Sequence, residues 1–193
     1  MDFNFDKDIF IQDKRLKLEA LQWDHFNFLL PVVLANPDLH KFSPSRYGSE
    51  MALKQYFENA FNQKERALRY PFAIFDKSTG TYAGSTSFGN ISNRDKRLEI
   101  GWTWIGSEFQ RTGLNRHCKY NLLQLAFEKL DFERVEFKTD ARNEQSKKAI
   151  IAIGGKFEGI LRSHTLMFDG HRRDTAYYGI LKSEWESIKK SIF

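Results

Sequence analysis

A loop between a strand-like and a helix-like segment carries residue types suited to binding phosphate. Arg111, Gly113 and Arg116 lie in this loop, and Gly113 directly precedes the strongest helical pattern of the chain. The first backbone N–H groups of a helix lack intrahelical partners and carry the positive end of its dipole, so they attract anions. Glycine lets a ligand approach the backbone, and arginine adds charge-assisted donors. The alternative is an ordinary strand-to-helix loop that uses glycine for its turn.

Basic residues gather in two segments, each of which follows a predicted strand. They are Arg111, Arg116 and Lys119 in the first, and Arg142, Lys147 and Lys148 in the second. A small polyanion such as a nucleotide diphosphate would suit these groups, and so would plain solvated surface. The formal net charge of +5 is only mildly basic. It does not by itself indicate nucleic-acid binding, which calls for a dense basic stripe.

The other reactive side chains form no recognisable metal-binding or nucleophilic set. Cys118 is the single cysteine and falls on an apolar helical stripe, so it is expected in the core and excludes an internal disulfide. No set of His, Asp and Glu has metal-ligand spacing, so no metal is expected. His164 and His171 lie near the last predicted turn, where a structural role and a substrate role both stay open. Three histidines are expected to be structural: His25, His40 and His117.

Hydrophobic periodicity defines the elements that must position these residues. Strands are predicted over Arg15–Leu21, Phe72–Asp76, Tyr82–Phe88, Arg97–Ile105, Arg134–Thr139, Phe157–Met167 and Thr175–Leu181. Helices are predicted over Trp23–Ala35, Ser49–Lys64, Leu114–Leu130, Asn143–Ile153 and Lys182–Lys190. Asp24 and Ser49 are candidate N-caps. This mixed order is typical of an α/β or α+β sheet with helices packed against it.

The strand Arg97–Ile105 contains an irregularity. Gly101 interrupts it, which indicates a β-bulge or a close backbone approach. Trp102 and Trp104 are two residues apart and should face the same side, where either burial against helices or the lining of a pocket would account for them.

Length and composition indicate one globular domain. The 193 residues suffice for one full core, and 41% hydrophobic with 15% aromatic residues exclude a disordered chain. No apolar run approaches the roughly 20 residues of a membrane span, and Met1–Phe10 lacks the cationic start of a signal peptide. We therefore expect a cytoplasmic protein in which residues 1–193 form a single domain with its core over residues 15–185.

Several ordered motifs resemble the GCN5-related N-acetyltransferases (GNAT). Gln110–Asn115 resembles the family signature Q/R-x-x-G-x-G/A, between the fourth strand and the next helix. Further blocks resemble the branch that includes the ribosomal-protein-alanine N-acetyltransferases. They are Leu98–Ile105, Asn143–Ser146 (N-x-x-S), Phe157–Arg162 (F-x-E-G-x-x-R), Asp169–Asp174, Tyr178–Leu181 and Glu184–Trp185. The resemblance covers Leu16 to Trp185.

The resemblance implies a central, mostly antiparallel mixed sheet of about seven strands flanked by helices. The sheet would splay between Arg97–Ile105 and Arg134–Thr139, and the pantetheine arm of acetyl-CoA would lie in that opening. Its pyrophosphate would meet the backbone N–H groups of the signature loop. The implied cofactor-binding residues are Trp104, Ile105, Gln110, Arg111, Thr112, Gly113, Leu114, Asn115, Arg116, Asn143 and Ser146.

Two positions depart from the family pattern. Asn115 replaces the last Gly or Ala of the signature, and its side chain would either crowd the pyrophosphate or bond to it. Since Asn tolerates unusual backbone angles, binding should survive. Ile150 stands where many members carry a Tyr that protonates the leaving thiolate, so that general acid is missing.

Two residues are candidates for proton transfer. Glu99 could act as a general base, alone or through water; alternatively it faces solvent or pairs with Arg97. Ser146 is the candidate proton donor by resemblance to N-x-x-S, whereas Asn143 could merely cap the helix there. Both roles of this pair can hold together.

The activity that the resemblance implies is acetyl-CoA-dependent transfer of an acetyl group to a primary amine, by direct transfer in a ternary complex. The acceptor would be a protein N-terminus or a small-molecule amine. The rival function is a catalytically weak acyl-CoA-binding sensor or scaffold, and a nucleic-acid-binding protein ranks last. The acceptor and the oligomeric state, a homodimer included, stay open.

Overall fold

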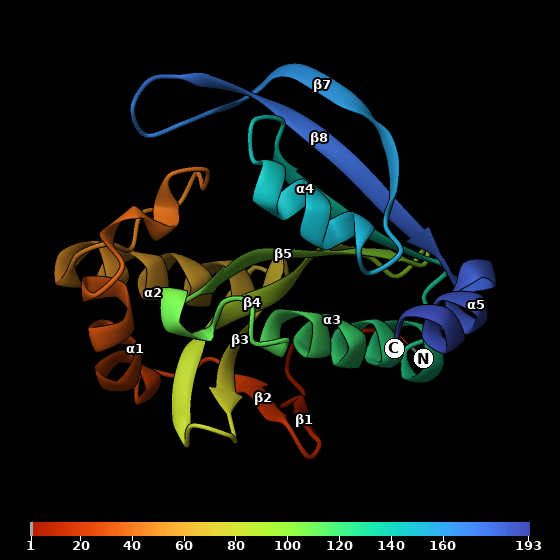
Figure 1. The fold of residues 1–193 in the computed structure, drawn as a ribbon, viewed down its shortest axis with the longest axis horizontal. Coiled ribbons are helices and arrows are strands. Elements are labelled where there is room, and N and C mark those ends of the chain that lie inside the picture. The colour runs from red at the N-terminus through yellow and green to blue at the C-terminus, as the bar shows by residue number, and fades with distance from the viewer. Residues whose placement is uncertain (1) are drawn as a thin grey trace.

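An eight-stranded sheet in the order β1-β2-β3-β4-β5-β6-β8-β7 organises residues 2–193, the part of the chain that this computed structural model describes (Figure 1). The strands are β1 Phe10–Gln12, β2 Leu16–Ala20, β3 Arg69–Asp76, β4 Thr81–Ser92, β5 Arg97–Ile105, β6 Arg134–Asp140, β7 Lys156–Leu166 and β8 Arg172–Leu181. All neighbouring strands are antiparallel except β5 and β6, which are parallel. The α/β class and the mixed, mostly antiparallel sheet are confirmed.

Five α-helices flank the sheet. They are α1 His25–Leu34, α2 Glu50–Glu65, α3 Leu114–Gln124, α4 Glu144–Ile151 and α5 Lys182–Ile192. Short 3-10 turns cover Pro37–His40 and Ser107–Phe109, and a π-helical turn over Leu125–Lys129 extends α3. All five predicted helices are present. Ser49 caps α2 by accepting from Ala52 N at 3.2 Å, whereas Asp24 makes no cap hydrogen bond.

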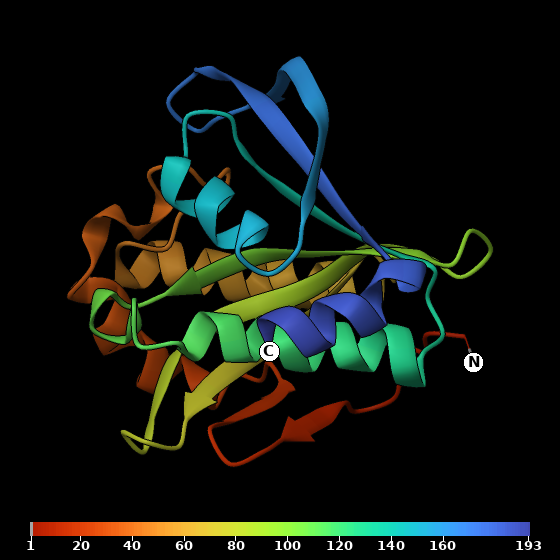
Figure 2. The same ribbon diagram turned by 45° about the vertical axis from the view of Figure 1, so that its right-hand side comes forward.

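The helices form layers on the two faces of the sheet. α1 and α2 pack on β4 and β3, and α3 lies over β2 on the opposite face. In both ribbon views α5 lies alongside α3 (Figures 1 and 2). The ring of Tyr120 on α3 packs against that of Trp185 on α5, with 5.9 Å between the ring centroids. Leu114, Cys118 and Leu122 are fully buried at four-residue spacing, as the apolar stripe predicts. β1 escaped prediction because three residues are too few to show a period.

The sheet opens between β5 and β6. These strands pair only over Arg97–Glu99 against Arg134–Glu136. Beyond that point β6 continues to Asp140 against β8 alone, and β5 continues to Ile105 against β4 alone. The segment Gly101–Ile105 therefore has no strand partner on its β6 side, and the predicted splay is confirmed.

A β-bulge interrupts β5 inside this segment, which pairs with β4 but not with β6. Ser85 pairs with Trp104 and Ser87 with Gly101, so Thr86 alone opposes Trp102 and Thr103. The predicted irregularity is present, but the left-handed residue is Trp102, with φ of 50°, and not the neighbouring glycine. The extra residue shifts the alternation of β5 by one.

The bulge directs both tryptophans to the α2 face. The Trp102 ring lies against the Arg69 guanidinium, and the centroids of the Trp104 and Tyr56 rings are 6.0 Å apart. Both tryptophans therefore face the same side, as predicted. Gly89 makes room for this arrangement, because a Cβ there would lie 2.3 Å from the Trp102 ring.

Gly89→Ala should therefore destabilise the fold by about 1–3 kcal/mol, the usual cost of an overpacked buried site. The cost should shrink in a Trp102→Ala background, where the opposing ring is gone. Urea unfolding of the two single variants and the double variant measures this coupling. Additive free energies would show that the Trp102 ring does not occupy this space.

Candidate active site

The helix α3 begins at the mouth of the splay with its first turn open. Gly113 occupies the N-cap position in the left-handed conformation, with φ of 86° and ψ of −10°. Gly113 itself has no side chain to cap the helix, and the space where a Cβ would lie there is empty within 4 Å. Thr112 Oγ1 accepts from Leu114 N at 3.4 Å, the one side-chain hydrogen bond that the described residues make to the N–H groups of this turn. The N–H groups of the first turn therefore face outward with no intrahelical partner. This is the geometry that an anion requires.

Side-chain hydrogen bonds fix the loop that precedes α3. Gln110 donates from Nε2 to the carbonyl of Ile105 at 3.1 Å, which ties the loop to the end of β5. Gln145 of α4 donates to Gln110 Oε1 at 3.1 Å, so the same residue also joins the two sides of the splay. Thr112 donates to the Phe109 carbonyl at 2.7 Å. This bracing role of Gln110 needs the three-dimensional arrangement and was missed by sequence reasoning.

Cations surround the open helix terminus. Arg111 and Arg116 are both exposed beside it. Arg15, which precedes β2, reaches Thr112 Oγ1 at 3.4 Å while it pairs with Asp76 at 3.1 Å. Sequence reasoning missed Arg15 because 97 residues separate it from Thr112.

The expectation that Lys119 lies with Arg111 and Arg116 is wrong. Lys119 points away from the loop and is buried under the sheet, with 7% of its surface exposed. In the second segment Arg142 pairs with Asp140 at 2.7 Å and Lys147 with Glu144 at 2.5 Å, so these cations are already compensated.

Three residues in and beside the loop differ in what they can offer a ligand. Asn115 holds its side-chain oxygen buried, with no hydrogen-bond partner among residues 2–193. Trp104 is 3% exposed and stacks on Tyr47 at 5.2 Å, so its indole packs in the core. Ile105 is also buried. Of Trp104 and Ile105, only backbone groups remain for a ligand in the splay.

Across the splay, α4 presents the N-x-x-S pair. Asn143 accepts from the backbone N of Ser146 at 3.0 Å, so it caps α4 as the structural alternative predicted. The Ser146 side chain is half-buried. Ile150, at the position of the missing tyrosine, is 8% exposed and packs against Gly155.

Glu99 is buried and paired. It accepts from Lys138 of β6 at 2.8 Å and from Asn90 of β4 at 2.6 Å, with 7% of its side chain exposed. The alternatives of a solvent-facing carboxylate or a pair with Arg97 are both wrong. Burial disfavours the charge of Lys138, but Glu99 outweighs it and raises the pKa of Lys138.

The remaining candidates lie outside the splay or inside the core. His164 of β7 is exposed and lies 3.1 Å from Thr175 and 3.4 Å from the Tyr177 hydroxyl. Burial raises the pKa of Cys118 to about 11, the opposite of what a nucleophilic thiolate needs. His25 and His117 lie against the carboxylates Glu19 and Asp13, which fits their structural role.

Metal-binding clusters and membrane spans are both absent from residues 2–193. No group of three or more His, Cys, Asp and Glu could hold a metal ion there. No helix in the described part of the chain is both long and apolar enough to cross a membrane.

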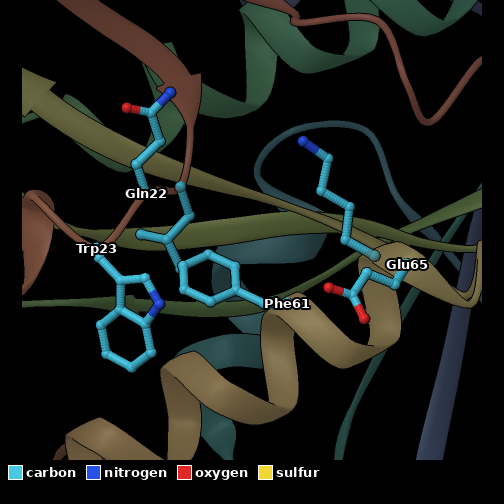
Figure 3. Close-up of a pocket in the computed structure, with 6 residues that line it drawn as sticks. Gln22, Trp23, Phe61 and Glu65 are labelled. Atoms are coloured by element: carbon cyan, nitrogen blue, oxygen red, sulfur yellow. The ribbon is translucent and has the colours of Figure 1, made fainter.

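An open pocket of about 440 Å³ lies on another part of the molecule, between the end of β2 and α2 (Figure 3). Leu21, Gln22, Trp23, Phe61, Lys64 and Glu65 line it. Trp23 packs on Phe57 and Phe61 there, at 5.5 and 5.2 Å. In the sheet, β3 and β4 lie between β2 and the splay edge of β5, so this pocket is distinct from the candidate site.

Sequence comparison agrees with this geometry. Residues 15–156 match the model of the acetyltransferase (GNAT) domain family. The chain therefore belongs to this family of acetyltransferases, and the resemblance of its motifs is confirmed.

Named relatives point to the same class. YdaF of Bacillus subtilis, which is provisionally named a ribosomal N-acetyltransferase, is 34% identical over 57% of this chain and 59% of its own length. The match thus spans less than two thirds of that relative. A crystal structure from T. thermophilus, provisionally described as an acetyltransferase, is 31% identical with a TM-score of 0.85, and the match covers 95% of this chain and 94% of that one. Ribosomal-protein-S5-alanine acetyltransferase from Vibrio fischeri shares the fold at 19% identity, with a TM-score of 0.73 over 92% of this chain and 99% of that one.

The buried pair across the splay yields a stability test. Lys138→Met leaves the Glu99 carboxylate without its cation and should cost about 3 kcal/mol in the free energy of unfolding. Lys189→Met, which breaks the more exposed pair with Glu128, should cost less than about 1 kcal/mol. Urea unfolding of both variants measures the difference. Equal costs would contradict a closely coupled Glu99–Lys138 pair.

Proposed function

We propose that this chain is an acetyl-CoA-dependent N-acetyltransferase that moves an acetyl group to a primary amine by direct transfer in a ternary complex. The observation that carries the proposal is the N-terminus of α3, with left-handed Gly113 as its N-cap, at the mouth of the splay between β5 and β6. The acceptor is a protein N-terminus or a small-molecule amine, and the relative YdaF is itself named a ribosomal N-acetyltransferase. The names of relatives do not choose between these two acceptors.

The residues around the splay fit this cosubstrate. The open first turn of α3, with Arg111, Arg116 and Arg15 nearby, would bind its phosphates. The β6-side backbone groups of Gly101–Ile105 would pair with the amides of its pantetheine arm, since no strand takes them. Asn143 lies on the opposite wall and would contact the same amides. Asn115 turns its side-chain oxygen into the protein, where it has no partner among residues 2–193, so this side chain does not crowd the proposed phosphate site.

Acetyl-CoA supplies an acetyl group activated as a thioester. The amine nitrogen forms the new C–N bond, the C–S bond breaks, and its electron pair leaves on the sulfur. The backbone N–H groups of the bulged β5 segment would stabilise the charge that develops on the carbonyl oxygen. An α-amine titrates near 8 and needs little help to lose its proton, whereas a lysine amine near 10.4 needs more.

Proton transfer would use the two candidates across the splay. Glu99 would accept the proton released by the amine, alone or through water, although this carboxylate already pairs with Lys138 at 2.8 Å. Ser146 would supply the proton that the thiolate takes up, in place of the tyrosine that Ile150 replaces.

An acyl-CoA-binding sensor or scaffold is the second candidate. The buried Ile150 at the position of the general acid favours it, since a weak proton donor slows turnover without affecting binding. A single domain over residues 1–193 and a cytoplasmic location remain predictions of the sequence, and the oligomeric state, a homodimer included, stays open.

Gly113→Asp should abolish acetyl-CoA binding, because it places a carboxylate at the open helix terminus and strains a left-handed position. Gly80→Asp is the matched control: Gly80 has φ of 70° and also has nothing within 4 Å, but it lies in the β3–β4 turn. Calorimetry of acetyl-CoA binding to the native chain and both variants measures the effect. Equal affinity in all three proteins would overturn the proposed phosphate site.

Turnover separates the enzyme from the sensor. Native protein with acetyl-CoA and a panel of primary amines and N-terminal peptides should release free thiol with at least one acceptor. Binding without release on any acceptor would favour the sensor.

Ser146→Ala should lower kcat about 100-fold with little change in the KM for acetyl-CoA, because it removes only the hydroxyl. The backbone N of residue 146 can still donate to Asn143, so the cap of α4 remains. Steady-state thiol release measures this split. An unchanged kcat would exclude Ser146 as the proton donor.

A further inference from the structure

Two buried cations flank the β-bulge of β5, one on each face of the sheet. On the α3 face, Lys119 donates to Thr103 Oγ1 at 2.6 Å and to Thr86 Oγ1 at 3.2 Å. On the α2 face, Arg69 of β3 donates from Nε to Ser87 Oγ at 2.7 Å and lies over the ring of Trp102. These contacts involve both bulged residues of β5 and their neighbours on β4.

Neither cation has a carboxylate partner in the described part of the chain. Lys119 is 7% exposed and Arg69 is 1% exposed, and hydroxyl groups accept from both. A buried charge that is not paired with an opposite charge is costly, and proteins rarely retain one without a function. Here two such charges of the same sign lie around one short segment of backbone.

The surroundings of Lys119 leave its charge uncompensated. Burial lowers the pKa of Lys119 to about 8. Cys118, the titratable neighbour on the same helix, stays a neutral thiol because burial raises its pKa to about 11. Asp13, the carboxylate packed against α3 from the loop before β2, is engaged by His117 at 2.6 Å and Asn121 at 2.7 Å. β4 and β5 offer Lys119 only the hydroxyls of Thr86 and Thr103.

The bulge lies where the proposed reaction develops negative charge. Trp102 and Thr103 belong to the segment of β5 that has no β6 partner. A ligand that places its phosphates at Gly113 can extend its arm along β5 from Ile105 toward Gly101. The far end of this arm then lies beside the bulge at Trp102 and Thr103.

We propose that Lys119 and Arg69 are positioning residues that hold the bulge from both faces and make it electropositive, so that it stabilises the negative charge of a coenzyme A thiolate. This inference rests on the proposed binding of coenzyme A in the splay. Both cations act through the bulged backbone and neither touches the ligand. Their buried charge costs stability, and the benefit appears only when an anion forms at the bulge.

The test uses coenzyme A itself as the probe. The pKa of its bound thiol is read from the ultraviolet absorbance of the thiolate during a pH titration of saturated native protein and of Lys119→Met. Methionine keeps the length of the side chain and removes the charge, and Thr86 and Thr103 can still bond each other at their present 2.8 Å. Below pH 8, where Lys119 keeps its proton, the thiolate fraction at a given pH should be about tenfold lower in Lys119→Met, which corresponds to a rise of about 1 in the thiol pKa.

Two further variants sharpen the result. Lys119→Arg keeps the charge and should keep the thiol pKa close to the native value. Lys129→Met removes an exposed positive charge from the π-helical turn that follows α3 and should leave the thiol pKa unchanged. An identical thiol pKa in native protein and Lys119→Met would overturn the inference while leaving the proposed function intact. Failure of native protein to bind coenzyme A would overturn the proposed function, and this inference with it.

Stability provides an independent readout that a merely structural lysine would not give. At neutral pH, Lys119→Met should unfold at the same urea concentration as native protein or a higher one, since it removes the cost of a buried charge. The native state releases this proton near pH 8, whereas the unfolded chain keeps it up to about pH 10.5. The free energy of unfolding of the native protein therefore rises between these two pH values. The difference in the free energy of unfolding between Lys119→Met and native protein should therefore become smaller as the pH rises from 8 to 10.5. A large loss of stability at neutral pH would show that Lys119 is structural.

Discussion

The parallel pairing of β5 with β6 ends after Glu99 and Glu136, and this early end determines the rest of the site. Every backbone donor and acceptor that a sheet leaves unpaired needs another partner. Between Gly101 and Ile105 the β6-side groups have none from a strand. The same separation leaves the loop before α3 at the mouth of the opening and α4 along its far wall. Gln110, which contacts Ile105 and Gln145, fixes these parts relative to one another.

The charges around this opening divide into two kinds. Glu99 with Lys138, and Asp140 with Arg142, are compensated pairs that hold β6 and its neighbours in place. Such pairs contribute little net stability, but the loss of one partner is costly. Within residues 2–193 no carboxylate pairs with Arg69 or Lys119, and both bond to hydroxyl groups. The molecule thus concentrates uncompensated positive charge beside the segment of β5 that β6 leaves without a partner.

Periodicity and motif placement predicted much of this from sequence. The strand Arg97–Ile105 has the predicted bounds, and the glycine before α3 was placed at the correct turn. The bulge was foreseen from Gly101, yet Trp102 takes the left-handed conformation, because Gly89 across the strand pair leaves space for its ring. Lys119 could not be placed, since its burial depends on two threonines 16 and 33 residues away. The partner of Glu99 lies on β6, and that pairing follows only from the parallel register.

The central claim is that coenzyme A binds in the splay between β5 and β6. Backbone amide chemical-shift changes on titration with coenzyme A test it most directly, because they locate the ligand on the chain. The account predicts the largest changes over Gly101–Ile105 and Gln110–Arg116, with smaller ones at the start of α4. Changes confined to the pocket beside Trp23 and Phe61, or the absence of any change, would contradict it.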